Sequence, residues 1–171
     1  MEKRDLYDIN RNLTGETIYK GEKIPENRYI NVVLSFIQNL KGEFLIQKRS
    51  IQKDGMYGST GGHAKTGESS IQAMMTEIKE EIGLTVKENE LELIYSGRSD
   101  IAQVFFDIYY LKKDIDINEL VLQKEEVEFV EWCSIKKIKE LEREGLFLEN
   151  HLEEFYRLID IFKERGRNIE L

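Results

Sequence analysis

Apolar and polar residues follow one another along the chain in a pattern that predicts several strands. Two runs with strand-like composition, 29–37 (YINVVLSFI) and 43–47 (EFLIQ), flank a turn at Lys41-Gly42, which is typical of a hairpin. Three further runs predict additional strands: residues 91–96, 103–111 and 127–132. The pattern therefore predicts a sizeable sheet.

The segments around these runs are less regular. Residues 6–19 predict an N-terminal strand or ribbon with a turn around residues 12–15, and a loop at residues 21–27 contains the only proline, Pro25. Residues 49–62 are rich in Gly, Ser, Lys and Asp, which predicts an irregular surface loop returning to a short strand near residues 57–60. Loops of this kind often carry function.

Three segments have helical periodicity: residues 70–82, 134–144 and 149–165. The first has the strongest boundary signals, because Ser69 and Gln72 form a capping-box pattern and Gly83 stands where a left-handed C-terminal cap would. Its apolar positions share one stripe, which must face the sheet: Ile71, Met74, Met75, Ile78 and Ile82. Strands with one central and two late helices predict a layered α/β domain.

Length and composition place this pattern in one globular domain. The chain has 171 residues, of which 40% are hydrophobic and 34% charged, so it can bury a core of useful size. We divide residues 1–171 into an N-terminal ribbon (about 1–27), a core (about 28–135) and C-terminal helices (about 134–166). No window reaches the roughly 18 uninterrupted apolar residues of a membrane span, and no secretory leader is visible, so a cytoplasmic location is the simplest expectation.

Charge and cysteine content exclude several classes of function. The formal charge of -8 disfavours nucleic acid as a partner, and no segregated basic patch is apparent. Cys133 is the single cysteine, which excludes an internal disulfide and a cysteine zinc site and favours a structural role. An acidic protein acting on an anionic phosphate needs local positive charge, which bound metal commonly supplies.

Three carboxylates share one face of the first helix. Glu77, Glu80 and Glu81 stand at i, i+3 and i+4, beside the apolar stripe. Like charges at these spacings disfavour a helix, so the protein needs either solvent or a cation there. Taken alone, such a run is usually a solvated acidic face.

The surrounding residues change that interpretation, because the segment resembles the box of the Nudix hydrolase family, G-x5-E-x7-R-E-U-x-E-E-x-G-U with U aliphatic. Eight positions match at the right spacing: Gly62, Glu68, Glu77, Ile78, Glu80, Glu81, Gly83 and Leu84. Thr76 departs from the pattern, because it stands where the family has an arginine that orients the glutamates. A threonine hydroxyl can still hold a neighbouring carboxylate or a water, and Arg49 is a candidate replacement for the missing charge.

The resemblance extends over roughly residues 28–135 and implies the Nudix α/β/α sandwich with a mixed β-sheet. It makes Glu77, Glu80 and Glu81 metal ligands or ligand-orienting bases, with the Gly62 carbonyl as a backbone ligand and Glu68 in support. These hard oxygen ligands suit Mg²⁺ or Mn²⁺. The implied nucleophile is water, activated by the metal or by a carboxylate, for which Glu77 and the loop acids Glu125 and Glu126 are candidates.

The substrate implied is a small diphosphate, such as a nucleoside diphosphate linked to another moiety. Arg49 is the preferred substrate contact, followed by His63 and Lys65, whereas His151 is expected to be structural. The N-terminal ribbon is also similar to the subgroup related to isopentenyl-diphosphate isomerase, and it makes a homodimer plausible.

Two alternatives remain open at this point. An isomerase is disfavoured, because Gly61 stands where that enzyme has a cysteine and Asn31 stands where it has a metal-binding histidine. A ligand sensor without turnover is suggested by Thr76, but the intact glutamates oppose it.

Overall fold

The computed structural model of the protein describes residues 1–168. Its main sheet has seven strands, with the order β5-β4-β3-β8-β7, and in addition β6 pairs with β3 and β9 with β4. The strands are β3 Ile30–Gln38, β4 Phe44–Arg49, β5 Tyr57–Gly58, β6 Gly61–His63, β7 Glu92–Ser99, β8 Val104–Lys112 and β9 Val127–Cys133. Strands β3 and β8 are parallel and the other recorded pairs are antiparallel, which confirms the expected mixed sheet.

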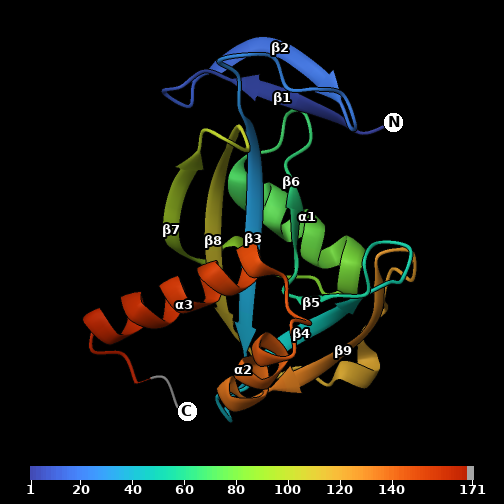
Figure 1. The fold of residues 1–171 in the computed structure, drawn as a ribbon, viewed down its shortest axis with the longest axis vertical. Coiled ribbons are helices and arrows are strands. Elements are labelled where there is room, and N and C mark those ends of the chain that lie inside the picture. Colours follow the sequence, from blue (N-terminus) through green and yellow to red (C-terminus); the bar gives the residue numbers. More distant parts are fainter. Residues whose placement is uncertain (169–171) are drawn as a thin grey trace.

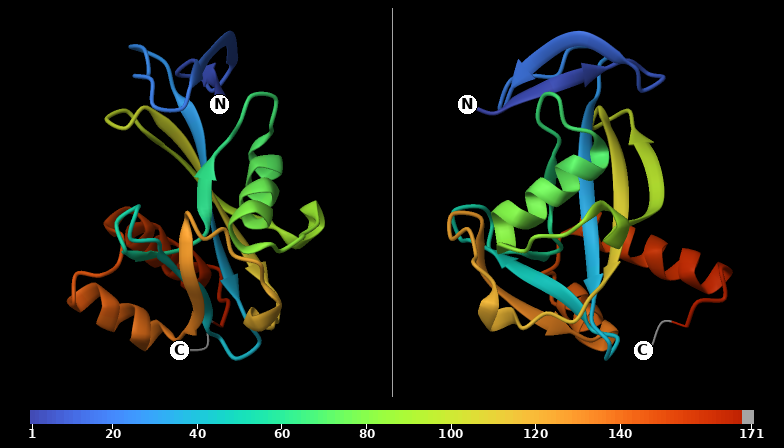
Figure 2. Two further views of the ribbon diagram at one scale, coloured as in Figure 1. Left: turned by 90° about the vertical axis from the view of Figure 1, so that its right-hand side faces the viewer. Right: turned by 180° about the vertical axis from the view of Figure 1, so that it is seen from behind.

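Helices cover both faces of this sheet. The helices are α1 Ser70–Ile82, α2 Ile135–Arg143 and α3 Glu149–Glu164, and short 3-10 turns occupy Glu88–Glu90 and Ile117–Glu119. Helix α1 packs on one face, and α2 and α3 pack on the other (Figures 1 and 2). The result is the predicted α/β/α layering, with one apolar cluster on each side of the sheet.

Helix α1 has the boundaries and the buried face that its sequence predicts. The Ser69 hydroxyl accepts a hydrogen bond from Gln72 N, Gln72 Oε1 accepts one from Ser69 N, and Gly83 ends the helix with φ 73°. Met74, Ile78 and Ile82 are fully buried, while the other two members of the stripe are partly buried. This packing fixes the rotation of the helix, and therefore the direction of its glutamates.

Strands β3 and β4 differ from the expected hairpin. The turn forms, because Asn39 N donates to Glu43 O at 2.9 Å, but the two strands pair only at Gln38 and Phe44. Beyond that pair they separate, since β6 takes the place beside β3 and β4 pairs with β9. The predicted loop at 49–62 returns as two short strands, β5 and β6, so Gly62 belongs to a strand and not to a loop.

The N-terminal ribbon is a separate two-stranded sheet of β1 Lys3–Tyr7 and β2 Leu13–Tyr19. The prediction of a turn at residues 12–15 was wrong, because the chain turns at residues 8–12. Asp8 Oδ1 accepts hydrogen bonds of 2.9 Å from both Asn10 N and Asn12 N, and Arg11 has φ 62°. The Asp8 side chain therefore forms the turn, a local competition that the strand pattern does not reveal.

The ribbon is attached to the body of the protein at several points and lies across the ends of β3 and β6 (Figure 1). Tyr7 and Tyr29 exchange backbone hydrogen bonds of 2.9 and 3.0 Å. Arg11 binds both carboxylate oxygens of Asp107 on β8, at 2.9 and 2.6 Å. Asp107 is buried and also accepts hydrogen bonds from the hydroxyls of Ser96 and Ser70, and Ser70 is the first residue of α1.

Among the residues that the structure describes, no helix is long and apolar enough to cross a membrane.

Candidate active site

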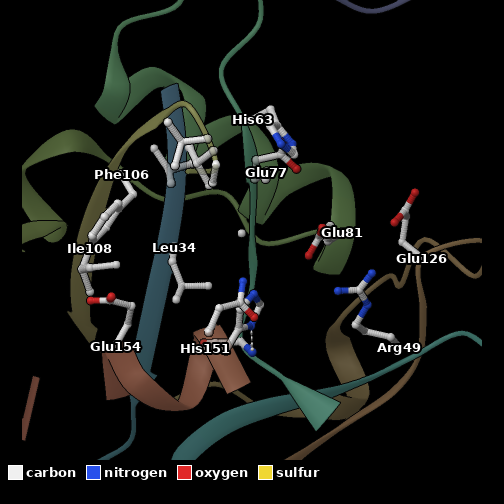
Figure 3. Close-up of a pocket in the computed structure, with 18 of the residues that line it drawn as sticks. Leu34, Arg49, His63, Glu77, Glu81, Phe106, Ile108, Glu126, His151 and Glu154 are labelled. Atoms are coloured by element: carbon white, nitrogen blue, oxygen red, sulfur yellow. Dashed lines mark hydrogen bonds between the residues drawn. The ribbon is translucent and has the colours of Figure 1, made fainter. Parts of the chain in front are cut away.

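A pocket of about 810 Å³ brings together most of the residues that the sequence singles out. Seven of the eight candidates line it: Arg49, Gly62, His63, Glu77, Glu80, Glu81 and Glu126. The eighth, Lys65, is outside this wall and is ion-paired to Glu80. Figure 3 shows Arg49, His63, Glu77, Glu81 and Glu126 on one side of the pocket. Leu34, Phe106 and Ile108 lie on the other side, together with the carboxylate of Glu154.

Gly62 is in contact with the carboxyl group of Glu77. A Cβ atom at Gly62 would lie 2.3 Å from Glu77 Cδ and 2.5 Å from Glu77 Oε2. Since such distances are far below van der Waals contact, a side chain at this position must displace the carboxylate. The glycine of the box is therefore required here by the close approach of a helix side chain to β6, and its φ plays no part.

Glu77 and Glu81 are buried carboxylates without a paired cation. They are 9% and 8% exposed. Burial, reinforced by the negative charges of Glu81 and Glu80, raises the pKa of Glu77 to about 8. Burial also raises the pKa of Glu81 to about 7, although a hydrogen bond of 3.0 Å from Gln47 Nε2 to Glu81 Oε2 opposes the shift. A positive charge placed beside these two carboxylates would stabilise their ionised forms.

Gln47 is itself held in place by a neighbour. Its Oε1 accepts a hydrogen bond of 3.1 Å from the Thr60 hydroxyl, and both residues are buried. The Gln47 amide is therefore oriented with its NH2 group toward Glu81. Sequence reasoning did not identify this residue, because a glutamine in the middle of a strand carries no recognisable signal.

Glu80 has a different environment from its two neighbours on the helix. Its Oε1 is 2.6 Å from Lys65 Nζ, and its side chain is 47% exposed. With the side chains in these positions, the described residues 1–168 contain no group of three or more acidic, histidine or cysteine side chains arranged to hold a metal ion. The expected three carboxylates are therefore divided into a buried pair and an exposed, ion-paired member.

Thr76 binds the other glutamate of the box. Its hydroxyl donates a hydrogen bond of 2.7 Å to Glu68 Oε2, and Glu68 Oε1 accepts one of 2.7 Å from Lys65 N. Glu68 thus connects α1 to the loop that precedes it. The structure places no arginine at this point: Arg49 is paired with Asp54, at 3.3 Å, so Arg49 does not take over the contact of the missing residue.

A charged cluster from the end of β4, the loop after it and the loop before β9 forms a further wall. Lys53 Nζ lies 2.8 Å from Glu126 Oε2, and Arg49 and Lys53 both lie near enough to Glu81 to oppose the increase in its pKa. Figure 3 shows Arg49 beside Glu126, with its guanidinium directed toward Glu81. Of the two loop acids, Glu126 lines the pocket, whereas Glu125 is exposed and is not among its lining residues.

The two histidines differ in position but are both neutral at neutral pH. His63 lies next to Glu77 (Figure 3), and burial, together with the positive charge of Arg4, lowers its pKa to about 4. His151, on α3, accepts a hydrogen bond of 3.0 Å at Nδ1 from Ser59 N. Burial lowers the pKa of His151 to about 4 as well. His151 also lines the pocket, a position that the expectation of a structural role did not include.

Cys133 lies in the apolar cluster under α2 and α3. Burial raises the pKa of its thiol to about 12, so the group stays protonated and unreactive at neutral pH. This environment is that of a structural cysteine, as the sequence predicted.

Several residues of the pocket wall were not predicted. The ribbon contributes Glu2, Arg4 and Lys20, and α3 contributes polar residues that include Glu154 and Arg157. The Arg157 guanidinium lies 4.3 Å from the centre of the Tyr95 ring. These segments carry no motif, so only their position in the fold identifies them.

Comparison with known proteins is consistent with this site. The NUDIX domain model matches residues 28–155. An uncharacterized Nudix hydrolase of Listeria innocua is 36% identical over 152 residues, which cover 86% of this chain and 89% of that protein. A similar protein of Listeria monocytogenes is 34% identical over 152 residues, with the same coverage of both chains.

Two solved structures have the same fold. A protein of Deinococcus radiodurans superposes with a TM-score of 0.74 at 20% identity, covering 91% of this chain and 98% of that one. The NUDIX domain of Shewanella oneidensis NrtR, in complex with ADP ribose, superposes with a TM-score of 0.60 at 16% identity and covers 80% of this chain and 88% of that one. From the matched family model and the Listeria relatives, the chain belongs to the NUDIX family and is a Nudix hydrolase, in a family whose activity is the cleavage of pyrophosphate bonds.

Proposed function

We propose that the protein hydrolyses a phosphoanhydride bond in a small diphosphate compound with the help of Mg²⁺ or Mn²⁺. The observation that carries the proposal is the buried pair Glu77 and Glu81, whose pKa values are raised to about 8 and about 7 at one end of a large pocket. The pocket volume of about 810 Å³ lies within the range of small-molecule sites.

The residues present fit a hard divalent cation. Glu77, Glu81 and the backbone carbonyl of Gly62 offer oxygen donors, which Mg²⁺ and Mn²⁺ prefer. The two carboxylates have no cation of their own to offset burial, so a divalent ion would relieve their repulsion and lower both pKa values. Glu80 would join them only by giving up its contact of 2.6 Å with Lys65 Nζ.

When bound, the cation supplies positive charge that offsets the charge of the diphosphate and of the departing phosphate. The oxygen of a water molecule attacks one phosphorus atom, the bridging P–O bond breaks, and the bridging oxygen leaves with the other phosphate. The proton lost by the water passes to a carboxylate. We assign this role to Glu126, because Glu77 and Glu81 would hold the cation, and Glu125 is exposed and does not line the pocket.

The cationic side chains of the site bind the phosphates. Arg49 lines the pocket and its pairing with Asp54, at 3.3 Å, is exposed enough to be exchanged for a phosphate. His63 is neutral, so it contributes a hydrogen bond and no charge. Lys65 acts through Glu80 in the present arrangement, and it would reach an anion when Glu80 turns to the cation.

The other end of the pocket favours a substrate with a bulky group beyond its diphosphate. Leu34, Phe106 and Ile108 offer apolar surface there, and Glu154 lies beside them (Figure 3). A nucleoside diphosphate linked to a second moiety has this combination of charged and flat apolar parts. The NrtR domain of the same fold binds ADP ribose, a compound of this class.

The test is a panel of diphosphates incubated with Mg²⁺ or Mn²⁺ in ¹⁸O-labelled water. The panel contains nucleoside triphosphates, nucleotide sugars, dinucleotides, coenzyme A and isoprenoid diphosphates, and both hydrolysis products and allylic isomers are measured. We expect ¹⁸O in one phosphate product, activity lost in Glu81→Gln, and activity kept in Glu88→Gln, which alters an exposed acid outside the pocket. An isomer without hydrolysis would support the isomerase alternative, and tight binding without products would support a sensor.

A further inference from the structure

The segment that matches the NUDIX domain begins at residue 28, but some residues that line the pocket precede it in the chain. Glu2, Arg4 and Lys20 of the N-terminal ribbon line the same pocket as Glu77 and Glu81. Part of the active site is therefore built from a segment outside the matched NUDIX domain. A contribution of this kind is a candidate source of substrate preference, because the machinery inside the box is shared by the family.

Arg4 is held in this wall in an unusual way. It is 8% exposed, and its Nε and Nη2 atoms both lie 2.8 Å from the same oxygen of Glu2, Oε1. A guanidinium has five N–H donors arranged as a fork that matches two oxygens of a carboxylate or a phosphate. One oxygen of Glu2 leaves most of these donors available.

The residues on both sides of Arg4 are hydrogen-bonded to the loop that leads into α1, Lys3 through its backbone and Asp5 through its side chain. Lys3 O accepts a hydrogen bond of 2.8 Å from Thr66 N, and Asp5 Oδ2 accepts one of 2.9 Å from Gly67 N. Arg4 stands between these two anchors. Its position relative to the glutamates of α1 is therefore set by bonds to the loop of the box itself, which is what a substrate contact requires.

We propose that Arg4 is a substrate-binding residue whose guanidinium binds a phosphate of the diphosphate, and that Glu2 occupies the guanidinium when substrate is absent. The carboxylate of Glu2 has the charge and hydrogen-bonding character of one edge of a phosphate, so binding exchanges one anion for another. This assignment rests on the proposed function, because it takes a diphosphate to be the ligand of the pocket. It makes the ribbon a wall of the active site.

Binding of inorganic pyrophosphate in the presence of Mg²⁺, measured by calorimetry on the full chain, tests the assignment without turnover. Arg4→Gln removes a charge-assisted contact, so we expect the Kd to increase by about 10- to 100-fold. Glu2→Gln removes the competing anion, so we expect the Kd to decrease several-fold. Lys3→Gln is the matched control, because Lys3 is on the same strand but does not line the pocket, and its Kd is expected to stay within about twofold of the wild type.

The opposite changes in Kd expected for Arg4→Gln and Glu2→Gln distinguish a ligand contact from a structural ion pair. If the Arg4 pair only stabilised the ribbon, both substitutions would loosen it and weaken binding alike. Equal directions for the two variants, an unchanged Kd in Arg4→Gln, or wild-type protein that does not bind pyrophosphate would overturn the proposal. If no panel compound is hydrolysed while pyrophosphate binding still shifts in opposite directions, the proposed hydrolysis is wrong and the assignment of Arg4 stands.

Discussion

The Thr76 hydroxyl donates a hydrogen bond of 2.7 Å to Glu68 Oε2, so the residue expected to replace the arginine of the box pattern binds a glutamate of the same pattern. Glu68 Oε1 also accepts a hydrogen bond of 2.7 Å from Lys65 N, so Glu68 connects helix α1 to the loop that precedes it. The threonine side chain does not carry the charge of an arginine. Position 76 therefore brings no positive charge to the buried carboxylates of Glu77 and Glu81.

Replacing Thr76 by valine keeps its shape and removes the hydroxyl, so Glu68 loses one of its two recorded partners. We expect a loss of about 1 kcal/mol in the free energy of unfolding and a fall of several-fold in the hydrolysis rate. Urea denaturation and steady-state kinetics check the two effects. Thr76→Ser keeps the hydroxyl and is the control, and a serine variant as impaired as the valine variant would show that the hydrogen bond is not the cause.

Gly62→Ala should abolish activity with little loss of fold. The new Cβ would stand 2.3 Å from Glu77 Cδ, and Glu77 can turn away more readily than the backbone of β6 can move. We expect a fall in activity of at least 100-fold, with circular dichroism and the unfolding midpoint close to those of the wild type. Wild-type turnover in Gly62→Ala would mean that the position of the Glu77 carboxylate does not matter for the reaction.

The stability of the metal-free protein should depend on pH through Glu77 and Glu81. Their pKa values in the folded protein, about 8 and about 7, exceed the ordinary 4.5, so the folded state binds more protons between these limits. The contribution of these two groups to the free energy of unfolding is therefore fully present below pH 4.5. This contribution is lost as the pH increases toward 8. A divalent cation restores it, because ionised carboxylates are what the cation binds.

Thermal unfolding at pH 5 and pH 8, with chelator or with Mg²⁺, measures this effect. We expect the metal to raise the Tm by roughly 5 °C or more at pH 8 and by much less at pH 5. In the double variant that combines Glu77→Gln and Glu81→Gln, the metal should raise the Tm no more at pH 8 than at pH 5. A stabilisation by Mg²⁺ that is as large at pH 5 as at pH 8 would be incompatible with the two carboxylates as ligands.

His151 should act in the opposite direction. Its pKa in the folded protein is about 4, below the ordinary 6.5, so the unfolded chain binds more protons between these values. Its contribution is fully present above pH 6.5 and is lost as pH falls through 4, with a size on the order of 3 kcal/mol. His151→Asn retains an acceptor for Ser59 N and cannot titrate, so the stability difference from wild type should change across this pH window. A constant difference would contradict a buried neutral imidazole.

Most of the regular structure could be predicted from the sequence, because its causes are local. Helix α1 has a cap at each end and an apolar stripe, and its predicted bounds agree with Ser70–Ile82. The separation of β3 and β4 could not be predicted, since it depends on which distant strands, β6 and β9, pair with them. The turn of the ribbon was misplaced for a different reason, because Asp8 bonds to its own neighbouring backbone.

The site could be predicted only as far as the box extends. The spacing of Glu77, Glu80 and Glu81 showed a shared face, but burial is decided by the sheet and by Gly62, so it separates Glu80 from the other two. Gln47 and Arg4 reach the pocket from a strand and a ribbon without motifs. Their roles follow from tertiary contacts that no local pattern encodes.

If Glu77 and Glu81 hold the divalent cation on which hydrolysis depends, a Mn²⁺ titration followed by electron paramagnetic resonance should detect it. We expect one tight Mn²⁺ site in the wild type and in Glu88→Gln, with the Kd increased at least about tenfold in Glu77→Gln and in Glu81→Gln. Wild-type affinity for Mn²⁺ in both of these glutamine variants would contradict this role of the two carboxylates.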